Sequence, residues 1–207
     1  MSVKTRPLTD EELSAFIRIL NADLPAEMTP YQACAALCLG TGGRISEILG
    51  MRNRDIFSDG KPLPRVSRNV LKRKRPVRMT AAFPWDLLGK PVIRWHEIRG
   101  WYGEDALFID RCRLTCWRKQ RELLALAGID PARIAFHGLR KTALGLFYRQ
   151  FCREAGGDSP SVWRKVQAQA CHARIDTTLG YLDHDDTRAS DTSILSAFDE
   201  VLKQKNV

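Results

Sequence analysis

The chain has 207 residues, 44% of them hydrophobic, which is enough for one globular domain with a buried core. Lys and Arg total 33 against 24 Asp and Glu, and the net charge of +9 favours a polyanionic partner, nucleic acid first. No segment approaches the roughly 18 apolar residues that span a bilayer, and the N-terminus lacks the apolar stretch of a secretory signal. We therefore expect a cytoplasmic protein that associates with the nucleoid.

The six cysteines favour reduced, buried thiols over disulfides, because they lie in apolar helical segments of a chain without an export signal. Two pairs are spaced four residues apart and could in principle hold zinc, but neither has the spacing of a zinc knuckle or a clear histidine partner. We expect structural thiols at all six positions, which are Cys34, Cys38, Cys112, Cys116, Cys152 and Cys171.

The first 50 residues predict three helices. Thr9 followed by Glu12 is a capping-box pattern, so a helix should begin there. A second helix should open at Thr29, with proline in its first turn, and run to Gly40, where a glycine turn follows. A short helix over 45–49 then follows, which places Arg44 at a tight glycine turn.

Residues 52–80 predict a small antiparallel sheet, because short alternating runs are broken by Asp59-Gly60, Pro62 and Pro64. A short apolar run at 106–109 and a flexible loop at 154–159 interrupt the second half of the chain, which otherwise favours helices. The expected helical segments are 84–101 in parts, 114–127, 139–153, 160–170 and 194–203. The predicted fold class is mixed α+β and predominantly helical.

Three short patterns occur in order along the chain. They are Thr41-Gly-Gly-Arg44-Ile-Ser-Glu47, then His137-Gly-Leu-Arg140, then His172 followed nine residues later by Tyr181. Each alone is common on protein surfaces, where an isolated arginine or histidine is usually a solvated side chain. Their order and spacing together carry the functional hypothesis.

These patterns resemble the catalytic domain of the tyrosine recombinase, or phage integrase, family. That family carries T-G-x-R-x-x-E, a lysine on a hairpin, H-x-x-R, and a histidine nine residues before a tyrosine, and the resemblance runs from about Leu8 through Tyr181. It implies the tyrosine-recombinase catalytic-domain fold, with its small antiparallel sheet, as a single domain over 1–207. Because only eight residues precede Thr9, we expect no N-terminal core-binding domain, and the chain is then either a short recombinase or a fragment.

The resemblance makes Tyr181 the nucleophile, and the residue types suit that chemistry. A phenol is easier to deprotonate than a serine hydroxyl, and nearby cations lower its pKa further. Arg44 and Arg140 would form a clamp on the phosphate, because a planar guanidinium donates two parallel hydrogen bonds and stays charged. Fixed cations can stabilise a phosphodiester under attack, so we expect no cofactor and no metal.

Further catalytic roles follow from the same resemblance. His137 would accept a proton or bind the phosphate, and His172 would donate a hydrogen bond to it. A hairpin lysine protonates the leaving 5′-oxygen in the family; we choose Lys72 over Lys74, although this basic cluster could simply contact the DNA backbone. Glu47 is expected to orient Arg44 or to brace the turn.

The sequence departs from the family in two places and ends in a tail. The 32 positions from Arg140 to His172 exceed the usual spacing, which indicates a surface insertion at 154–163, and Cys171 replaces a glycine. After Tyr181, a polar linker precedes a tail helix at about 187–204, which the resemblance suggests docks on a neighbouring protomer. The expected assembly is a homotetramer on double-stranded DNA.

The sequence therefore predicts a site-specific recombinase that cleaves and rejoins DNA through a 3′-phosphotyrosyl intermediate and a Holliday junction. One alternative is a catalytically silent DNA-binding regulator on the same fold. Another is a type IB topoisomerase or telomere resolvase, which shares the chemistry but not the exchange of partners.

Overall fold

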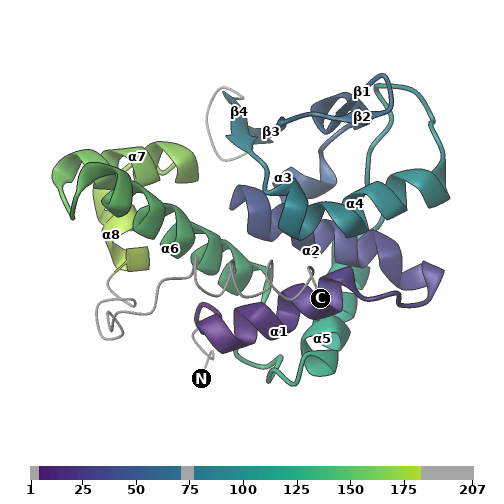
Figure 1. The fold of residues 1–207 in the computed structure, drawn as a ribbon, viewed down its shortest axis with the longest axis horizontal. Helices are drawn as coiled ribbons and strands as arrows, with labels where there is room; N and C mark the ends of the chain where they lie inside the picture. The colour runs from purple at the N-terminus through teal and green to yellow at the C-terminus, as the bar shows by residue number, and fades with distance from the viewer. Residues whose placement is uncertain (1–4, 71–76, 183–207) are drawn as a thin grey trace.

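The protein is predominantly helical with two small antiparallel sheets, as predicted (Figure 1). The structure is a computed structural model and describes residues 5–70 and 77–182. The predicted hairpin lysine, Lys72 or Lys74, and the predicted tail helix at 187–204 lie outside the described residues. None of the described helices is long and apolar enough to cross a membrane.

Helix α1, Asp10–Asn21, begins at the predicted capping box. Thr9 Oγ1 accepts a hydrogen bond from the Glu12 N–H at 3.2 Å, and the Glu12 carboxylate accepts one from the Thr9 N–H at 2.9 Å. These two bonds satisfy backbone donors that have no partner within the helix. The helix then buries one apolar face, formed by Leu13, Phe16, Ile17 and Leu20.

Helix α2, Thr29–Thr41, is the centre of the fold, and all of its residues are buried. The short 3-10 helix η1, Ala26–Met28, leads into it, and α1, α4, α5 and α6 pack around it. The helix ends at Gly42, whose φ of 64° is left-handed, and α3, Ile45–Leu49, follows with the predicted bounds. The core of the domain therefore leads directly into the turn that carries Arg44.

The predicted sheet consists of two hairpins. After the 3-10 helix η2, Asn53–Asp55, strands β1, Phe57–Ser58, and β2, Lys61–Pro62, pair antiparallel. Strands β3, Arg65–Val70, and β4, Val77–Ala82, form the longer hairpin, in which Val70 faces Val77. Residues 71–76, between these two strands in the sequence, lie outside the described part of the chain.

Two helices complete the main body of the domain. Helix α4, Trp85–Arg99, is continuous although we predicted only a partly helical segment, and it accommodates Pro91 in its interior. The apolar run at 106–109 crosses to the α3–η2 connection, where the Phe108 N–H donates to the Met51 carbonyl at 2.8 Å. Helix α5, Arg113–Leu126, follows as predicted.

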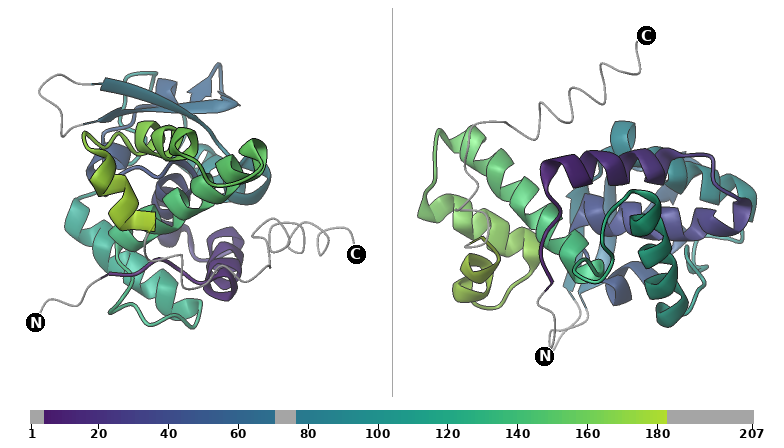
Figure 2. Two further views of the ribbon diagram at one scale, coloured as in Figure 1. Left: turned by 90° about the vertical axis from the view of Figure 1, so that its left-hand side faces the viewer. Right: turned by 90° about the horizontal axis from the view of Figure 1, so that it is seen from below.

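Helix α6, Phe136–Ala155, connects this body to two further helices, α7, Pro160–Ala170, and α8, Ile175–Leu182. It begins three residues before the predicted start, so His137 and Arg140 both lie at its N-terminal end. The contiguous hydrophobic core among the described residues extends from Leu8 to Leu139, and α7 and α8 pack on the rest of α6, away from α1–α5 (Figures 1 and 2). Helix α8 was not predicted.

The segment before α1 is bound to the start of α6. The Leu8 N–H donates to Thr142 Oγ1 at 2.9 Å, and Lys141 Nζ donates to the Thr5 carbonyl at 2.7 Å. A Cβ at Gly138 would lie 2.7 Å from the Arg6 carbonyl oxygen, so the two segments approach closely. The glycine within the His137-to-Arg140 pattern is thus explained by packing.

The prediction of buried cysteines holds for Cys34, Cys38, Cys116 and Cys171 but is wrong for Cys112, which is exposed, and for Cys152, which is only partly buried. Cys112 is exposed because it caps the N-terminus of α5, where its sulfur accepts the Thr115 N–H. Hydrogen bonds from Thr115 lower the pKa of this thiol. A capping position lies outside the buried face of its helix, which the apolar spacing did not reveal.

Candidate active site

The turn between α2 and α3 holds Arg44 in place. Thr41 Oγ1 accepts the Gly43 N–H at 3.1 Å and donates to the Leu37 carbonyl at 2.7 Å, which closes the end of α2. A Cβ at Gly43 would come within 2.7 Å of the Ile48 side chain, so the turn leaves no space there for a larger residue. Arg44 is the residue that caps α3.

Glu47 orients Arg44 from within the same short helix. Its carboxylate is fully buried and forms an ion pair with Arg44 Nη1 at 2.9 Å, and it accepts the Arg44 backbone N–H at 3.0 Å. The Arg44 side chain is 23% exposed, so its guanidinium can still meet a ligand from outside. These contacts agree with the role that we predicted for Glu47.

A third arginine, Arg68 on β3, reaches the same carboxylate and was not predicted as a site residue. Its Nη1 lies 2.6 Å from Glu47 Oε2, and its side chain is only 2% exposed. The alternation of β3 contained a signal for it: Val66, Arg68 and Val70 share one face of the strand, and both valines are buried. An arginine between two inward-facing valines should have been expected in the interior.

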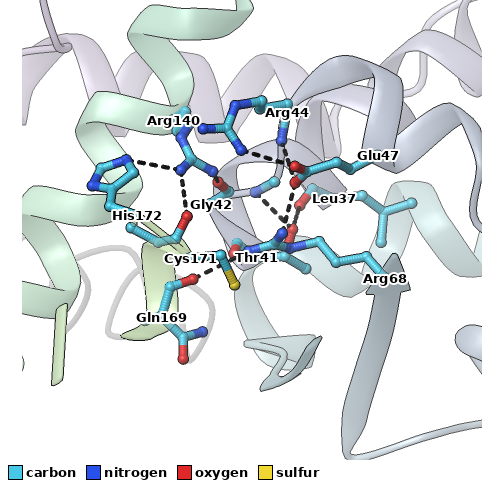
Figure 3. Close-up of polar contacts among 12 residues, drawn as sticks. Leu37, Thr41, Gly42, Arg44, Glu47, Arg68, Arg140, Gln169, Cys171 and His172 are labelled. Carbon is cyan, nitrogen blue, oxygen red and sulfur yellow. Dashed lines mark hydrogen bonds and ion pairs between the residues drawn. The ribbon is translucent and has the colours of Figure 1, made fainter. Parts of the chain in front are cut away.

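Arg140 on α6 brings the three sequence patterns together (Figure 3). Its Nη1 donates to the Gly42 carbonyl at 2.5 Å, and its Nη2 donates to the Ala170 carbonyl at 2.6 Å. Nη2 also lies 3.1 Å from His172 Nε2. The side chain is fully buried. Through these hydrogen bonds it joins the turn of Arg44 to the segment that carries His172.

His172 is buried and neutral in this setting. Burial lowers its pKa to about 4, helped by the positive charges of Arg140 and Arg44 and by His137. Because Arg140 donates to Nε2, the ring proton belongs on Nδ1, which lies 3.0 Å from Thr178 Oγ1. In this arrangement the imidazole positions Arg140, and Thr178 fixes its tautomer.

Cys171 adopts the conformation in which the resemblance expects glycine. It caps the C-terminus of α7 with φ 54° and ψ 39°, in the left-handed region that disfavours side chains. Its N–H donates to the Ala168 carbonyl at 3.0 Å. The turn before His172 is therefore formed despite the substitution.

Two of the remaining predicted residues, His137 and Tyr181, belong to described helices. His137 is exposed on the first turn of α6, and its influence on the His172 pKa places it near the same site. Tyr181 belongs to α8, one helical turn after Thr178. Lys72 follows β3 in the sequence and falls outside the described residues.

Arg44, Arg68 and Arg140 contribute three positive charges and Glu47 one negative charge, so these four residues carry a net charge of +2 (3 − 1). Positive groups held in fixed positions stabilise charge that develops on an oxyanion. Among residues 5–70 and 77–182, we find no group of three or more His, Cys, Asp or Glu side chains arranged to hold a metal ion. The arrangement suits an anionic ligand such as a phosphodiester.

The fold is that of tyrosine recombinase catalytic domains. The XerH site-specific recombinase, in a post-cleavage complex with the difH substrate, has a TM-score of 0.66 at 16% identity over 90% of this chain and 51% of its own. The XerA recombinase has a TM-score of 0.64 at 20% identity over 99% and 66%. The lambda integrase catalytic core has a TM-score of 0.52 at 20% identity over 83% and 93%.

Residues 6–188 match the model of the phage integrase family, and the chain belongs to that family. It spans about half the length of the XerH chain to which it is similar. None of the curated protein sequences matches it.

Proposed function

We propose that the protein is a site-specific DNA recombinase that cleaves and rejoins DNA through a 3′-phosphotyrosyl intermediate. The observation that supports this most directly is the position of Arg140. Its contacts with the Gly42 and Ala170 carbonyls join the turn of Arg44 to the segment of His172. Residues more than 90 positions apart in the sequence thus form one cationic group, as phosphoryl chemistry requires.

In the proposed reaction, the Tyr181 phenolate attacks the scissile phosphorus and the bond from phosphorus to the 5′-oxygen breaks. Lys72 donates a proton to the leaving 5′-oxygen, and His137 accepts the proton that the Tyr181 phenol loses. The phosphotyrosyl bond conserves the energy of the broken linkage, so a 5′-hydroxyl from a partner duplex can attack it and release Tyr181. A Holliday junction is the intermediate, and ATP is not consumed.

The burial of each cation suggests when it acts. Arg44 is partly exposed and can contact a non-bridging phosphate oxygen in the structure as it stands. Arg140 and His172 are buried, so direct contact between either side chain and the phosphate requires the segment 169–172 to move. We propose that DNA binding causes this movement and exchanges the contact between Arg140 and the Ala170 carbonyl for one to phosphate.

The proposed partner is double-stranded DNA, bound by a homotetramer. A net charge of +9 favours such a polyanion and predicts strongly salt-dependent binding. Lambda integrase, whose fold is similar, has been crystallised as a dimer bound to a core site. For this chain, we propose that the tail at 187–204 links protomers on the DNA.

The recognition site can be found together with the activity. The wild-type protein is incubated with a pool of nicked duplexes of randomised sequence, and DNA that is covalently attached to protein is recovered and sequenced. We expect adducts that share a sequence, and we expect Tyr181→Phe to form none while it retains DNA binding. Tyr148→Phe is the matched control, because Tyr148 lies on α6 and has no assigned role.

Other outcomes would favour the alternatives. If the wild type binds DNA sequence-specifically but forms no adduct, the proposed enzymatic activity is contradicted. The protein would then be a catalytically silent DNA-binding regulator. Adducts with relaxation of supercoiled DNA, but without exchange between two duplexes, would indicate a type IB topoisomerase. Recombinant products from two site-bearing duplexes would support the proposal.

A further inference from the structure

We propose that Arg68 is a positioning residue that keeps the Arg44 site net positive by neutralising Glu47. The inference rests on the proposed function, because it concerns how the same site attracts a phosphate. It assigns a role to a residue outside the three sequence patterns.

The carboxylate of Glu47 is shared between two guanidinium groups. Oε1 accepts from Arg44 Nη1 at 2.9 Å, and Oε2 accepts from Arg68 Nη1 at 2.6 Å. Oε2 also accepts the Arg44 backbone N–H at 3.0 Å. The shorter ion pair is therefore the one to Arg68, and Figure 3 shows both arginines converging on Glu47 from different elements.

Burial separates the roles of the two arginines. The Arg68 side chain is 2% exposed, whereas that of Arg44 is 23% exposed. Arg68 therefore cannot reach a phosphate on DNA from its position, and its positive charge acts on Glu47. Arg44 can meet the phosphate directly.

The charges explain why a second arginine is needed. Glu47 is fully buried, and a buried carboxylate beside a single arginine would form a neutral pair with it. Arg44 would then be oriented but would attract a phosphate weakly, because the adjacent negative charge offsets its own. With Arg68 included, the three residues carry a net charge of +1 (2 − 1).

Arg68 also connects the two halves of the site. Its Nη2 donates to the Gln169 carbonyl at 3.2 Å, on the segment that leads to His172, and lies 3.5 Å from the Thr41 carbonyl. A Cβ at Gly43 would lie 3.0 Å from Arg68 Cδ, so the arginine is packed directly against the turn of Arg44. Removal of its side chain should loosen both segments.

The test compares Arg68→Met, Glu47→Gln and the double variant. On the selected nicked duplex, we expect Arg68→Met to lower the single-turnover rate of adduct formation by about tenfold or more. The double variant should be faster than Arg68→Met, because Glu47→Gln removes the unneutralised charge. A purely structural role predicts a double variant that is no faster. Arg99→Met is the control, since Arg99 donates similar hydrogen bonds, to Asn53 and Phe108, away from the site.

A second readout does not depend on DNA cleavage. Inorganic sulfate at matched ionic strength should raise the thermal midpoint of the wild type more than chloride does, because a bound anion stabilises the folded state. Arg99→Met measures the general effect of sulfate on stability. We expect Arg68→Met, like Arg44→Met, to lose at least half of the sulfate-specific shift, and the double variant to regain part of it.

The outcomes distinguish the two proposals. Adduct formation and sulfate shift in Arg68→Met within about twofold of wild type would overturn the role of Arg68. Loss of both, without recovery in the double variant, would overturn the charge mechanism. If the wild type forms no adduct but the sulfate pattern appears, the recombinase proposal fails and the role of Arg68 stands. If Arg68→Met does not fold, Arg68→Lys replaces it, because lysine keeps the positive charge. After the shift of Arg99→Met is subtracted, Arg68→Lys should retain more of the sulfate shift than Arg44→Met.

Discussion

The two halves of the candidate site differ in how they are packed against the main hydrophobic core. Arg44 and Glu47 follow α2, every residue of which is buried in the main core. His172 and Tyr181 belong to the α7–α8 region, which packs on the outer part of α6 beyond that core. Segments with fewer buried contacts open at lower free energy than the core. The site is therefore assembled from one rigid part and one part that is easier to displace.

Two arginines cross the boundary between these parts. Arg140 donates to the Ala170 carbonyl, and Arg68 donates to the Gln169 carbonyl, so both reach the last turn of α7. Hydrogen bonds from a guanidinium are stronger than neutral ones. Hydrogen bonds from these two arginines thus hold α7 against the main body, whereas apolar packing holds the helices of the main body together.

The largest effect should come from Arg140→Lys, because this variant should lose adduct formation as well as stability; it tests whether this boundary depends on a guanidinium. The ammonium group keeps the charge but cannot reach the Gly42 and Ala170 carbonyls together, so one buried acceptor loses its partner. We expect a loss of roughly 2–3 kcal/mol in the free energy of unfolding. Adduct formation should be lost while most DNA binding remains.

Hydrogen exchange would localise that effect. We expect the amides of α7 to lose more protection than those of α2 in Arg140→Lys. Equal losses of protection in α2 and α7 would contradict the claim that the α7–α8 part of the site is easier to displace. Parallel losses of DNA cleavage and DNA binding would contradict it as well.

The next effect is the loss of folding stability at low pH that His172, in the α7–α8 region, should cause. The pKa of His172 is lowered to about 4 in the folded protein, against 6.5 for an unperturbed histidine. The unfolded chain therefore binds the proton more readily, and stability falls as the pH drops from about 6.5 to about 4. His172 should account for a loss of about 3 kcal/mol over this window.

Denaturant unfolding of wild type and His172→Asn at several pH values would measure this contribution. The variant should be less stable at pH 7 and should lose less stability on acidification. Carboxylates and His96 titrate in both proteins, so the difference between the two curves isolates His172. Parallel curves would show that His172 is not buried as a neutral ring.

The smallest effect compares two left-handed caps, Gly42, whose carbonyl Arg140 contacts, and Cys171, which follows the Ala170 carbonyl that Arg140 contacts. Gly42 ends α2 with φ 64°, and Cys171 ends α7 with φ 54°. Gly42→Ala should cost about 1–2 kcal/mol, because a side chain strains this conformation. Cys171→Gly should change stability by less than about 1 kcal/mol, because relief of that strain offsets the lost thiol packing. A larger loss at Cys171 than at Gly42, measured by urea unfolding, would reverse the comparison.

Local signals made much of the main body predictable. The capping box at Thr9 and the glycines after α2 are short-range features, and the helices that they delimit were found within a residue or two. The hairpins were predicted from alternation and turn residues for the same reason. Helix α8 was missed because its eight residues provide little periodicity.

The site itself was only partly predictable. The spacing of the patterns identified Arg44, Arg140 and His172 as a group, and the structure brings these three together. Their partners could not be foreseen, because backbone carbonyls such as those of Gly42 and Ala170 have no sequence signature. The prediction that Lys72 and Tyr181 complete the site remains a prediction.

The attachment of residues 5–8 to α6 has a mechanical consequence. Tension applied through the N-terminus would load α6 as well as α1, because Thr5 and Leu8 are hydrogen-bonded to Lys141 and Thr142, while Arg6 is ion-paired with Glu12 of α1. It would load the helix that carries His137 and Arg140. A force or a bulky group acting at this end of the domain would therefore be felt by the helix that carries the cationic site as well as by the main core.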